Sequence, residues 1–313
     1  MAKRKIRVAI NGFGRIGRAA FKIMLDKKKY DVVAINDLAP AESLAYLLKY
    51  DTVYGAYGKK VLVKGHDIYV GGKKYHITAQ ADPKKLPWKK LKIDVVLECT
   101  GRFVKDGAAD AHIKAGAKKV IISAPAKGGG VDTFLLGVNQ AGYKNQKVIS
   151  NASCTTNCIA PVAQILVSKF GVDKAMMTTI HSYTADQALV DGPHKKDPRR
   201  GRSAAQNIVP TSTGAAIATA EVIPELRGLF DGLAVRVPTP IVSLSDFTFL
   251  LKKDVTVKQI NNVLITASKS KQYKGILGVT DEPVVSSDFI GDERSSIVDL
   301  SLTKVVGGNM VKI

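Results

Sequence analysis

The chain has few cysteines and no long run of apolar residues. Its 313 residues include three cysteines, an odd and sparse set that suits a reducing cytoplasm better than a disulfide framework. No apolar stretch approaches the roughly 20 residues needed to cross a bilayer. Residues 1–5 run directly into a strand pattern rather than into the apolar centre of a signal peptide. We therefore expect a cytoplasmic protein that spans no membrane, and the lack of zinc-type ligand spacing predicts no bound metal.

Acidic side chains are scarce relative to basic ones. There are 27 Asp and Glu against 47 Lys and Arg, which gives a formal net charge of +20. Such a charge attracts polyanions and draws phosphorylated substrates toward a positive surface. Much of it, however, is lysine in surface-like patches such as residues 84–92, which we interpret as a solvated face, and aromatic side chains make up only 6% of the chain. Because so few aromatic residues are present to stack on bases, we interpret the charge as a modifier of behaviour rather than as the function.

Glycine and apolar residues are plentiful by comparison. With 27 glycines and 45% hydrophobic residues, the chain is long enough for two domains with their own cores. In the first half, short apolar runs at residues 6–10, 32–35, 95–97 and 119–122 alternate with helical segments. This alternation predicts a mainly parallel sheet that is covered by helices.

The first apolar run is followed by the spacing Gly-x-Gly-x-x-Gly at Gly12, Gly14 and Gly17. The pattern follows a predicted strand and opens a predicted helix, which is the context of a dinucleotide-binding loop. Gly12 permits a tight turn, Gly14 lets the backbone approach a pyrophosphate, and Gly17 lets the helix pack on the sheet. Asp37 ends the next strand, where its carboxylate can accept hydrogen bonds from the adenosine ribose and repel a 2′-phosphate. The first half is thus predicted to bind NAD rather than NADP.

Longer alternating runs characterise the second half, at residues 174–181 and 243–250. Period-two alternation predicts half-exposed antiparallel strands, and two helical segments interrupt them. The predicted fold class is therefore α/β. A Rossmann-type, doubly wound, mainly parallel sheet is expected in the NAD-binding domain, residues 1–153. An α+β catalytic and substrate-binding domain with a mainly antiparallel sheet is expected in residues 154–313.

One cysteine stands where a strand gives way to a helix. Residues 147–150 have a strand pattern and residues 159–166 have helical apolar spacing, which places Cys154 at the helix N-terminus. Unpaired backbone N–H groups and the positive end of the helix dipole stabilise a thiolate there, so the pKa of the thiol should fall. Cys154 is the predicted nucleophile. Cys158 and Cys99 lack such a setting and are interpreted as packing residues.

Five segments resemble phosphorylating glyceraldehyde-3-phosphate dehydrogenases, in the order of that family: residues 11–18, 152–158, 181–184, 210–216 and 236–240. The resemblance extends from residue 6 to the last residue. It implies the reversible, NAD-dependent conversion of D-glyceraldehyde 3-phosphate and inorganic phosphate to 1,3-bisphosphoglycerate in glycolysis and gluconeogenesis. Cys154 would form a thiohemiacetal, pass hydride to nicotinamide and then hold a thioacyl intermediate that phosphate attacks. His181 would take up the thiol and hydroxyl protons.

The same resemblance implies the residues that contact anions and cofactor. It assigns Thr184 and Arg236 to the phosphate of the substrate, with Arg202 close to both anion positions. The attacking phosphate would be held by hydroxyls and backbone N–H groups of Ser153, Thr155, Thr213 and Gly214. The cofactor contacts, from the pyrophosphate loop through the adenosine to the nicotinamide side, would be Gly12, Gly14, Arg15, Ile16, Gly17, Asn36, Asp37, Thr100, Gly101 and Ser123.

Two stretches depart from the pattern of the family. Residues 183–206 look like the family's long loop between subunits, which implies a homotetramer. Within them, Asp-Gly-Pro at residues 191–193 replaces the Leu-Pro pair common in NAD-specific members, so we expect slightly weaker discrimination against NADP. The sequence also stops at Ile313, where family members continue through a further strand into a final helix. Absence of that segment is expected to loosen the hold on the nicotinamide ring and lower activity.

Two other functions stay open at this stage. One is oxidation of erythrose 4-phosphate with water as the final acceptor, which the second phosphate pocket with Thr213 and Gly214 disfavours. The other is a catalytically weakened homologue that binds RNA or another polyanion through its net charge of +20. The intact pair of Cys154 and His181 favours the enzyme. The remaining histidines are interpreted as structural, namely His66, His76, His112 and His194.

Overall fold

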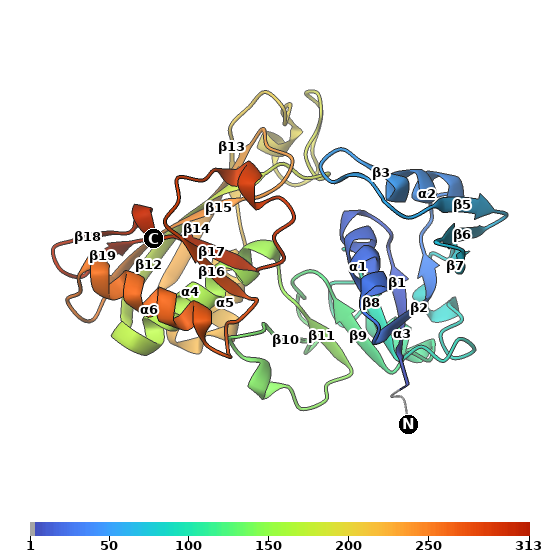
Figure 1. Cartoon of the computed structure of the whole chain (residues 1–313), viewed down its shortest axis with the longest axis horizontal. Helices are drawn as coiled ribbons and strands as arrows, with labels where there is room; N and C mark the ends of the chain where they lie inside the picture. The colour runs from blue at the N-terminus through green and yellow to red at the C-terminus, as the bar shows by residue number, and fades with distance from the viewer. Residues whose placement is uncertain (1–3) are drawn as a thin grey trace. The chain divides into compact units, whose positions relative to one another are not determined.

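The computed structural model of the chain describes residues 4–313 and divides into two compact units (Figure 1). The first unit holds the chain up to Phe134 together with Tyr143–Ala152, and the second holds Leu135–Gly142 and Ser153–Ile313. The sequence predicts a single change of domain between residues 153 and 154. In the structure, the short segment 135–142 additionally packs within the second unit, where Gln272 Nε2 donates a hydrogen bond of 2.6 Å to the carbonyl of Gly137.

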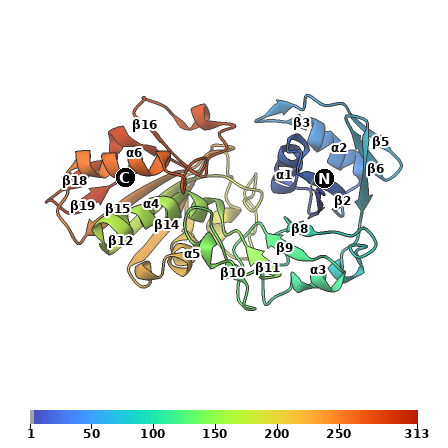
Figure 2. The same ribbon diagram turned by 60° about the horizontal axis from the view of Figure 1, so that its bottom comes forward.

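The first unit is built on a nine-stranded sheet in the order β10-β11-β9-β8-β1-β2-β7-β6-β5 (Figure 2). All pairings from β10 to β7 are parallel, and only the two edge pairings of β6 are antiparallel. The predicted mainly parallel sheet is therefore confirmed. Its strands are β1 (Ile6–Asn11), β2 (Tyr30–Asn36), β5 (Val61–Lys64), β6 (Asp67–Val70), β7 (Lys73–Thr78), β8 (Val95–Glu98), β9 (Lys119–Ile122), β10 (Asp132–Thr133) and β11 (Val148–Ser150).

Two apolar cores lie on the two faces of this sheet, because successive side chains of a strand point to opposite sides. On β1, Val8 and Ile10 pack with α1 and α2, whereas Ala9 belongs to the core around Trp88 and α3. The helices of this unit are α1 (Arg15–Asp26), α2 (Ala41–Lys49) and α3 (Asp110–Lys114), and a small hairpin is formed by β3 (Tyr50–Asp51) and β4 (Gly55–Ala56). The carboxyl ends of the central strands carry the loops that contain the predicted cofactor residues.

The lysine-rich segment 84–92 is only partly the solvated face that its sequence suggests. Its lysines are exposed, but Trp88 is fully buried and Leu86 nearly so, both in the core beside α3. Charge counting missed this burial because the two apolar side chains point inward from between the lysines. The short 3-10 turn η1 (Pro83–Lys85) overlaps the start of the segment.

The second unit contains a six-stranded sheet in the order β13-β14-β12-β15-β19-β18. Every pairing except that of β12 with β14 is antiparallel, so the predicted mainly antiparallel sheet is confirmed. The strands are β12 (Val172–Ser182), β13 (Val209–Ser212), β14 (Phe230–Val237), β15 (Leu244–Leu251), β18 (Lys304–Val306) and β19 (Met310–Lys312). The one parallel pairing matters for the site, because it brings the carboxyl ends of β12 and β14 to the same edge of the sheet.

Three helices accompany this sheet, α4 (Cys154–Phe170), α5 (Ala215–Val222) and α6 (Val257–Lys269). Helix α4 packs on β15 and also contacts α5 and α6, and α5 packs on β14. The remaining elements are the parallel pair β16 (Leu277–Thr280) and β17 (Ser296–Asp299) and the 3-10 turns η2 (Gln140–Gly142), η3 (Pro198–Gly201), η4 (Pro224–Leu226), η5 (Ser286–Phe289) and η6 (Leu300–Leu302). Among residues 4–313, no helix has the length and apolar character that a membrane crossing requires.

Candidate active site

Cys154 is the first residue of α4, as the sequence predicts. The preceding Ser153 is the N-cap: its hydroxyl accepts a hydrogen bond of 3.0 Å from the backbone N–H of Thr156, which satisfies one of the free donors of the first turn. No acidic side chain lies in that turn. The sulfur therefore lies at the positive end of a 17-residue helix.

His181 lies beside this sulfur, near the carboxyl end of β12. Its Nε2 is 3.5 Å from Cys154 Sγ, and its Nδ1 is 2.7 Å from the carbonyl oxygen of Ser182. Burial of the sulfur by itself raises the pKa of the Cys154 thiol, but the hydrogen bond and charge of His181 and the contacts of Thr155 outweigh it, and the pKa is lowered. The residue as a whole remains exposed, so a thiolate formed here is accessible to a reactant.

Arg236 stands opposite His181 in the parallel pairing of β14 with β12. Its Nη1 lies 2.9 Å from His181 Nδ1, donates to the carbonyl of Ser182 at 2.8 Å and reaches Thr184 Oγ1 at 3.5 Å. Burial and then the nearby charge of Arg200 lower the pKa of Arg236. Its Nε is buried and has no hydrogen-bond partner. A buried cationic donor without a partner suits an anionic ligand.

A residue with strained backbone geometry, Val242, contacts Ser182, the neighbour of His181. Val242 has a φ of 64°, which is unusual for a β-branched side chain. Its carbonyl accepts a hydrogen bond of 2.8 Å from the Ser182 hydroxyl, and Ser182 N–H donates to Ser243 Oγ at 3.2 Å. These contacts hold the end of β12, and with it His181, in place.

The start of α5 supplies the remaining predicted anion contacts. Thr213 Oγ1 accepts from the N–H of Ala215 at 3.2 Å, and Gly214 is the N-cap without a side chain. A Cβ added at Gly214 would meet no atom within 4 Å, so the backbone here is open to a ligand. Thr213 is half-buried and Gly214 is exposed. Both positions are compatible with phosphate binding at a helix start.

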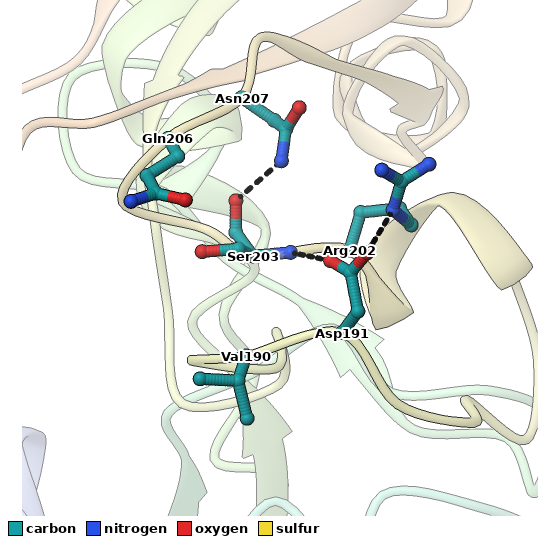
Figure 3. Close-up of a pocket in the computed structure, with 6 residues that line it drawn as sticks. All are labelled: Val190, Asp191, Arg202, Ser203, Gln206 and Asn207. Atoms are coloured by element: carbon teal, nitrogen blue, oxygen red, sulfur yellow. Dashed lines mark hydrogen bonds and ion pairs between the residues drawn. The ribbon is translucent and has the colours of Figure 1, made fainter.

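Arg202 contacts a carboxylate in its own loop, and no hydrogen bond joins it to Arg236 or Thr184. Arg202 is exposed, and its Nε donates to the carboxylate of Asp191 at 2.8 Å. Figure 3 shows this ion pair at the rim of a hollow of about 330 Å³ that is lined by Val190, Asp191, Arg202, Ser203, Gln206 and Asn207. These contacts do not support the predicted position of Arg202 near both anions.

Arg200 is not among the site residues that the sequence predicts, yet it contacts the end of β13 just before Thr213. Its Nη1 donates to Asp186 at 2.6 Å, its Nε to Thr211 Oγ1 at 2.9 Å, and its Nη2 to the carbonyl of Ser212 at 3.2 Å. Its charge also lowers the pKa of Arg236, after the effect of burial. The sequence has three arginines at positions 199, 200 and 202. The turn η3 determines that Arg200 is the one that contacts β13.

The predicted cofactor loop lies in the first unit, between β1 and α1. A Cβ on Gly17 would lie 2.1 Å from the carbonyl oxygen of Gly12, so only glycine allows this close packing. Gly14 caps α1 without any side-chain hydrogen bond, and no acidic residue occupies the first turn. These features fit a pyrophosphate at the helix start. The exposed Arg15 and Ile16 follow in the first turn of α1.

Asp37 follows β2 and closes the same loop. Its Oδ2 accepts from the N–H of Phe13 at 2.7 Å, and its Oδ1 accepts from the N–H of Ala39 at 3.0 Å. Each oxygen retains acceptor capacity for a ribose hydroxyl. The other predicted contacts, Asn36, Thr100, Gly101 and Ser123, follow or end the neighbouring strands β2, β8 and β9. The residues present thus fit a dinucleotide.

The two other cysteines have the packing roles that their sequence context indicates. Burial raises the pKa of the Cys99 thiol to about 11. Burial also raises the pKa of Cys158, whose sulfur lies 3.8 Å from Ser296 Oγ. Neither thiol is poised to form a thiolate. Within residues 4–313, no group of three or more His, Cys, Asp and Glu residues is arranged to hold a metal ion.

Comparison with known proteins identifies the family. The profile described as "Glyceraldehyde 3-phosphate dehydrogenase, NAD binding domain" matches residues 6–106, and that of the C-terminal domain matches residues 153–313. The chain is 52% identical over 310 residues to the glyceraldehyde-3-phosphate dehydrogenase of Priestia megaterium, covering 98% of this chain and 92% of the relative. It is 50% identical, with the same coverage, to glyceraldehyde-3-phosphate dehydrogenase 1 of Bacillus subtilis. The chain therefore belongs to the glyceraldehyde-3-phosphate dehydrogenase family.

Proposed function

We propose that the chain catalyses the reversible, NAD-dependent oxidation and phosphorylation of D-glyceraldehyde 3-phosphate to 1,3-bisphosphoglycerate in glycolysis and gluconeogenesis. The observation that carries this proposal is the contact of 3.5 Å between Cys154 Sγ and His181 Nε2 beside the unpartnered Nε of Arg236. Residues 1–153 would bind NAD and residues 154–313 would bind the substrate. When bound, NAD supplies the acceptor for the hydride.

Cys154 begins the reaction as a thiolate. We assign the Nδ1 proton of His181 to the carbonyl of Ser182 at 2.7 Å, so that Nε2 faces the sulfur and takes the thiol proton. Arg236 Nη1 then donates to the same carbonyl at 2.8 Å and makes no hydrogen bond to Nδ1. The sulfur then attacks the aldehyde carbon. A C–S bond forms, the carbonyl electron pair moves to oxygen, and His181 Nε2 returns its proton to that oxygen as the thiohemiacetal forms.

In the oxidation step, the proton that His181 gave to the substrate oxygen returns to His181. His181 takes the hydroxyl proton again, the C=O bond re-forms, and the hydride leaves the same carbon, which leaves a thioester on Cys154. Inorganic phosphate then attacks the thioester carbon, the C–S bond breaks, and Cys154 leaves as thiolate. Because a thiolate at the start of α4 is stabilised, it is a good leaving group as well as a good nucleophile.

The same geometry supports a proposal for the anion contacts. We propose that Arg236 and Thr184 bind the phosphate of the substrate, since the free Nε of Arg236 lacks any other partner. Ser153, Thr155, Thr213 and Gly214 would bind the attacking phosphate through hydroxyls and backbone N–H groups. We propose Arg200 as the additional cation of this group in place of Arg202. The predicted cofactor residues keep their proposed roles.

An assay of NAD reduction tests the function as a whole. With D-glyceraldehyde 3-phosphate, NADH formation should require inorganic phosphate and should run backward from 1,3-bisphosphoglycerate. A chain that oxidises erythrose 4-phosphate to the acid without phosphate would contradict the proposal and favour the related dehydrogenase instead.

The two neighbouring arginines provide a matched pair of variants. Arg200→Gln should raise the KM for inorganic phosphate or for the aldehyde substrate about tenfold or more, because a charge-assisted contact to phosphate is lost. Arg202→Gln removes the same charge from an exposed ion pair and should change both KM values by less than about twofold. Steady-state kinetics of the two purified variants measure this. An equal or larger effect of Arg202→Gln would show that Arg202 has the anion role.

We also propose that the chain assembles as a homotetramer. Several large apolar side chains of the second unit are strongly exposed, with Leu189 at 77%, Val190 at 74% and Ile208 at 71%. Exposed apolar surface of this kind is typical of contacts between subunits. Light scattering of the purified protein should give the mass of four chains of 33.6 kDa. A monomer mass at micromolar concentration would exclude the assembly.

A cytoplasmic location and weak polyanion binding complete the proposal. All three cysteines are free in the structure, which suits a reducing compartment. Fractionation of source cells tests this location, and recovery outside the cytoplasm would contradict it.

The net charge of +20 supports only non-specific contact with polyanions. Such binding should be lost as salt is raised through physiological strength, and salt-resistant RNA binding would contradict this interpretation.

A further inference from the structure

A buried polar cluster lies in the first unit, on the central strands of the sheet. It comprises Glu98 at the end of β8, His112 on α3, Trp88, and Asn11 at the end of β1. Each has an exposed fraction of 1% or less. Burial of so many polar groups is unfavourable unless each finds a partner. The catalytic chemistry proposed above uses none of them.

The carboxylate of Glu98 is fully occupied by four donors. Its Oε2 accepts from Asn11 Nδ2 at 2.6 Å and lies 2.9 Å from His112 Nε2. Its Oε1 accepts from the backbone N–H of Thr100 at 2.8 Å and from the hydroxyl of the same residue. Two oxygens with two donors each leave no acceptor site for a further group. The carboxylate thus ties β1, β8 and α3 together at one point.

The hydrogen-bond direction at His112 follows from its other nitrogen. Trp88 Nε1 can only donate, and it does so to His112 Nδ1 at 3.0 Å. His112 Nε2 therefore carries the proton that is donated to Glu98. The two hydrogen bonds of His112 therefore have fixed directions: the imidazole accepts from Trp88 and donates to Glu98.

The cluster reaches each strand end that carries a predicted cofactor contact. Asn36 Nδ2 donates to Asn11 Oδ1 at 2.7 Å, and Gly12 N–H donates to the carbonyl of Asn36 at 2.8 Å. On the other side, the carbonyl of Glu98 accepts from Ser123 N–H at 3.0 Å and from Ser123 Oγ at 3.1 Å. The side chain of Glu98 meanwhile holds Thr100. One residue thus connects, directly or through Asn11, the glycine loop and the ends of β2, β8 and β9.

We propose that Glu98 and His112 are positioning residues for the dinucleotide. They would hold the glycine loop and the Thr100 turn at the spacing that the cofactor requires. The inference rests on the cofactor contacts assigned above. A purely structural role would be met as well by apolar side chains of similar volume, because replacing a buried polar pair in this way is often neutral for stability. Apolar side chains cannot orient the Thr100 N–H and Asn11 amide.

Glu98→Gln tests the proposal with little change in shape. The amide offers one acceptor oxygen and one NH₂ group. Its NH₂ group must therefore face donors, either those of Thr100 or those of the pair Asn11 and His112. The dissociation constant of NAD, measured by calorimetry, and the KM for NAD should both rise at least about tenfold. The KM for the aldehyde substrate should stay within about twofold, as should the rate of Cys154 alkylation by iodoacetamide without NAD. Unchanged NAD affinity, within about threefold of the parent, would overturn the proposal.

A stability control separates positioning from general weakening. Ile68 is fully buried on β6, in the other core of the same unit, and takes no part in the cluster. Ile68→Ala should lower the Tm but leave the dissociation constant of NAD within about threefold. The single tryptophan, Trp88, reports by its emission whether its site stays buried in each variant. If Ile68→Ala weakens NAD binding as much as Glu98→Gln does, the proposal is wrong.

Two substitutions of His112 keep the test decisive if Glu98→Gln does not fold. In His112→Gln, an amide oxygen can accept from Trp88 while its NH₂ donates to Glu98, so NAD binding should stay within about threefold of the parent. His112→Leu removes both contacts and should weaken NAD binding at least about tenfold. Equal dissociation constants for the two variants would overturn the proposal. Because calorimetric NAD binding needs no turnover, failure of the proposed reaction would be distinguishable from failure of this inference.

Discussion

Replacing Cys154 with serine is expected to lower kcat about 10⁴-fold or more, while the protein stays folded and binds NAD. The thiol is stabilised as thiolate by His181 Nε2 at 3.5 Å and by the start of α4, whereas a serine hydroxyl at the same place ionises far less readily. Removal of a nucleophile that forms a covalent intermediate has effects of this size in other enzymes. Phosphate-dependent NADH formation by the purified variant measures it.

Cys158→Ser is the matched control. Cys158 lies one helical turn further along α4, and burial raises the pKa of its thiol, so it supplies no thiolate. This variant should keep kcat within about threefold of the parent. Substantial activity in Cys154→Ser, or its loss only in Cys158→Ser, would contradict the covalent mechanism.

His181→Asn is expected to lower kcat by about 10²- to 10⁴-fold, the usual contribution of a general acid–base group. It should also change the pH dependence of Cys154 alkylation. Burial raises the pKa of Cys154, whereas His181 contributes the two largest lowering effects. Only the thiolate reacts, so the parent rate should rise with pH around a midpoint below that of an ordinary cysteine. Without His181 the midpoint should move to higher pH.

His76→Asn controls for loss of an imidazole elsewhere. His76 is exposed in the first unit, where its Nδ1 pairs with Asp67 at 2.8 Å. This variant should change neither kcat nor the alkylation profile of Cys154. If the midpoint of alkylation is the same in His181→Asn as in the parent, the contact of 3.5 Å does not activate the thiol.

Local patterns predicted much of this structure because they arise from short-range physics. The Gly12-x-Gly14-x-x-Gly17 spacing identified the β1–α1 turn, and the Cβ clash of 2.1 Å at Gly17 shows why no other residue serves there. The placement of Cys154 at a helix start likewise followed from adjacent strand and helix patterns. Alternation of apolar residues distinguished the parallel sheet of the first unit from the mainly antiparallel sheet of the second.

Contacts between distant residues were less accessible to sequence reasoning. The different contacts of Arg200 and Arg202 depend on the turn η3: Arg200 donates to the carbonyl of Ser212, whereas Arg202 pairs with Asp191. Local spacing does not distinguish these two arginines. Trp88 looked like part of a lysine-rich surface, yet it lies buried and donates to His112. The segment 135–142 packs with the second unit, although the sequence marks no change of domain there.

By itself, the sequence predicted the change from a mainly parallel to a mainly antiparallel sheet, the glycine turn before α1 and the place of Cys154 at a helix start, because each depends on residues that are neighbours in the chain. Only the tertiary structure decided which side chains meet: His181 opposite Arg236 through a parallel pairing, and Glu98 with Asn11, Thr100 and His112 beside the cofactor loops. Such meetings depend on strand order and register, which no local pattern encodes. They are set by burial of the apolar faces and by the requirement that every buried polar group find a partner.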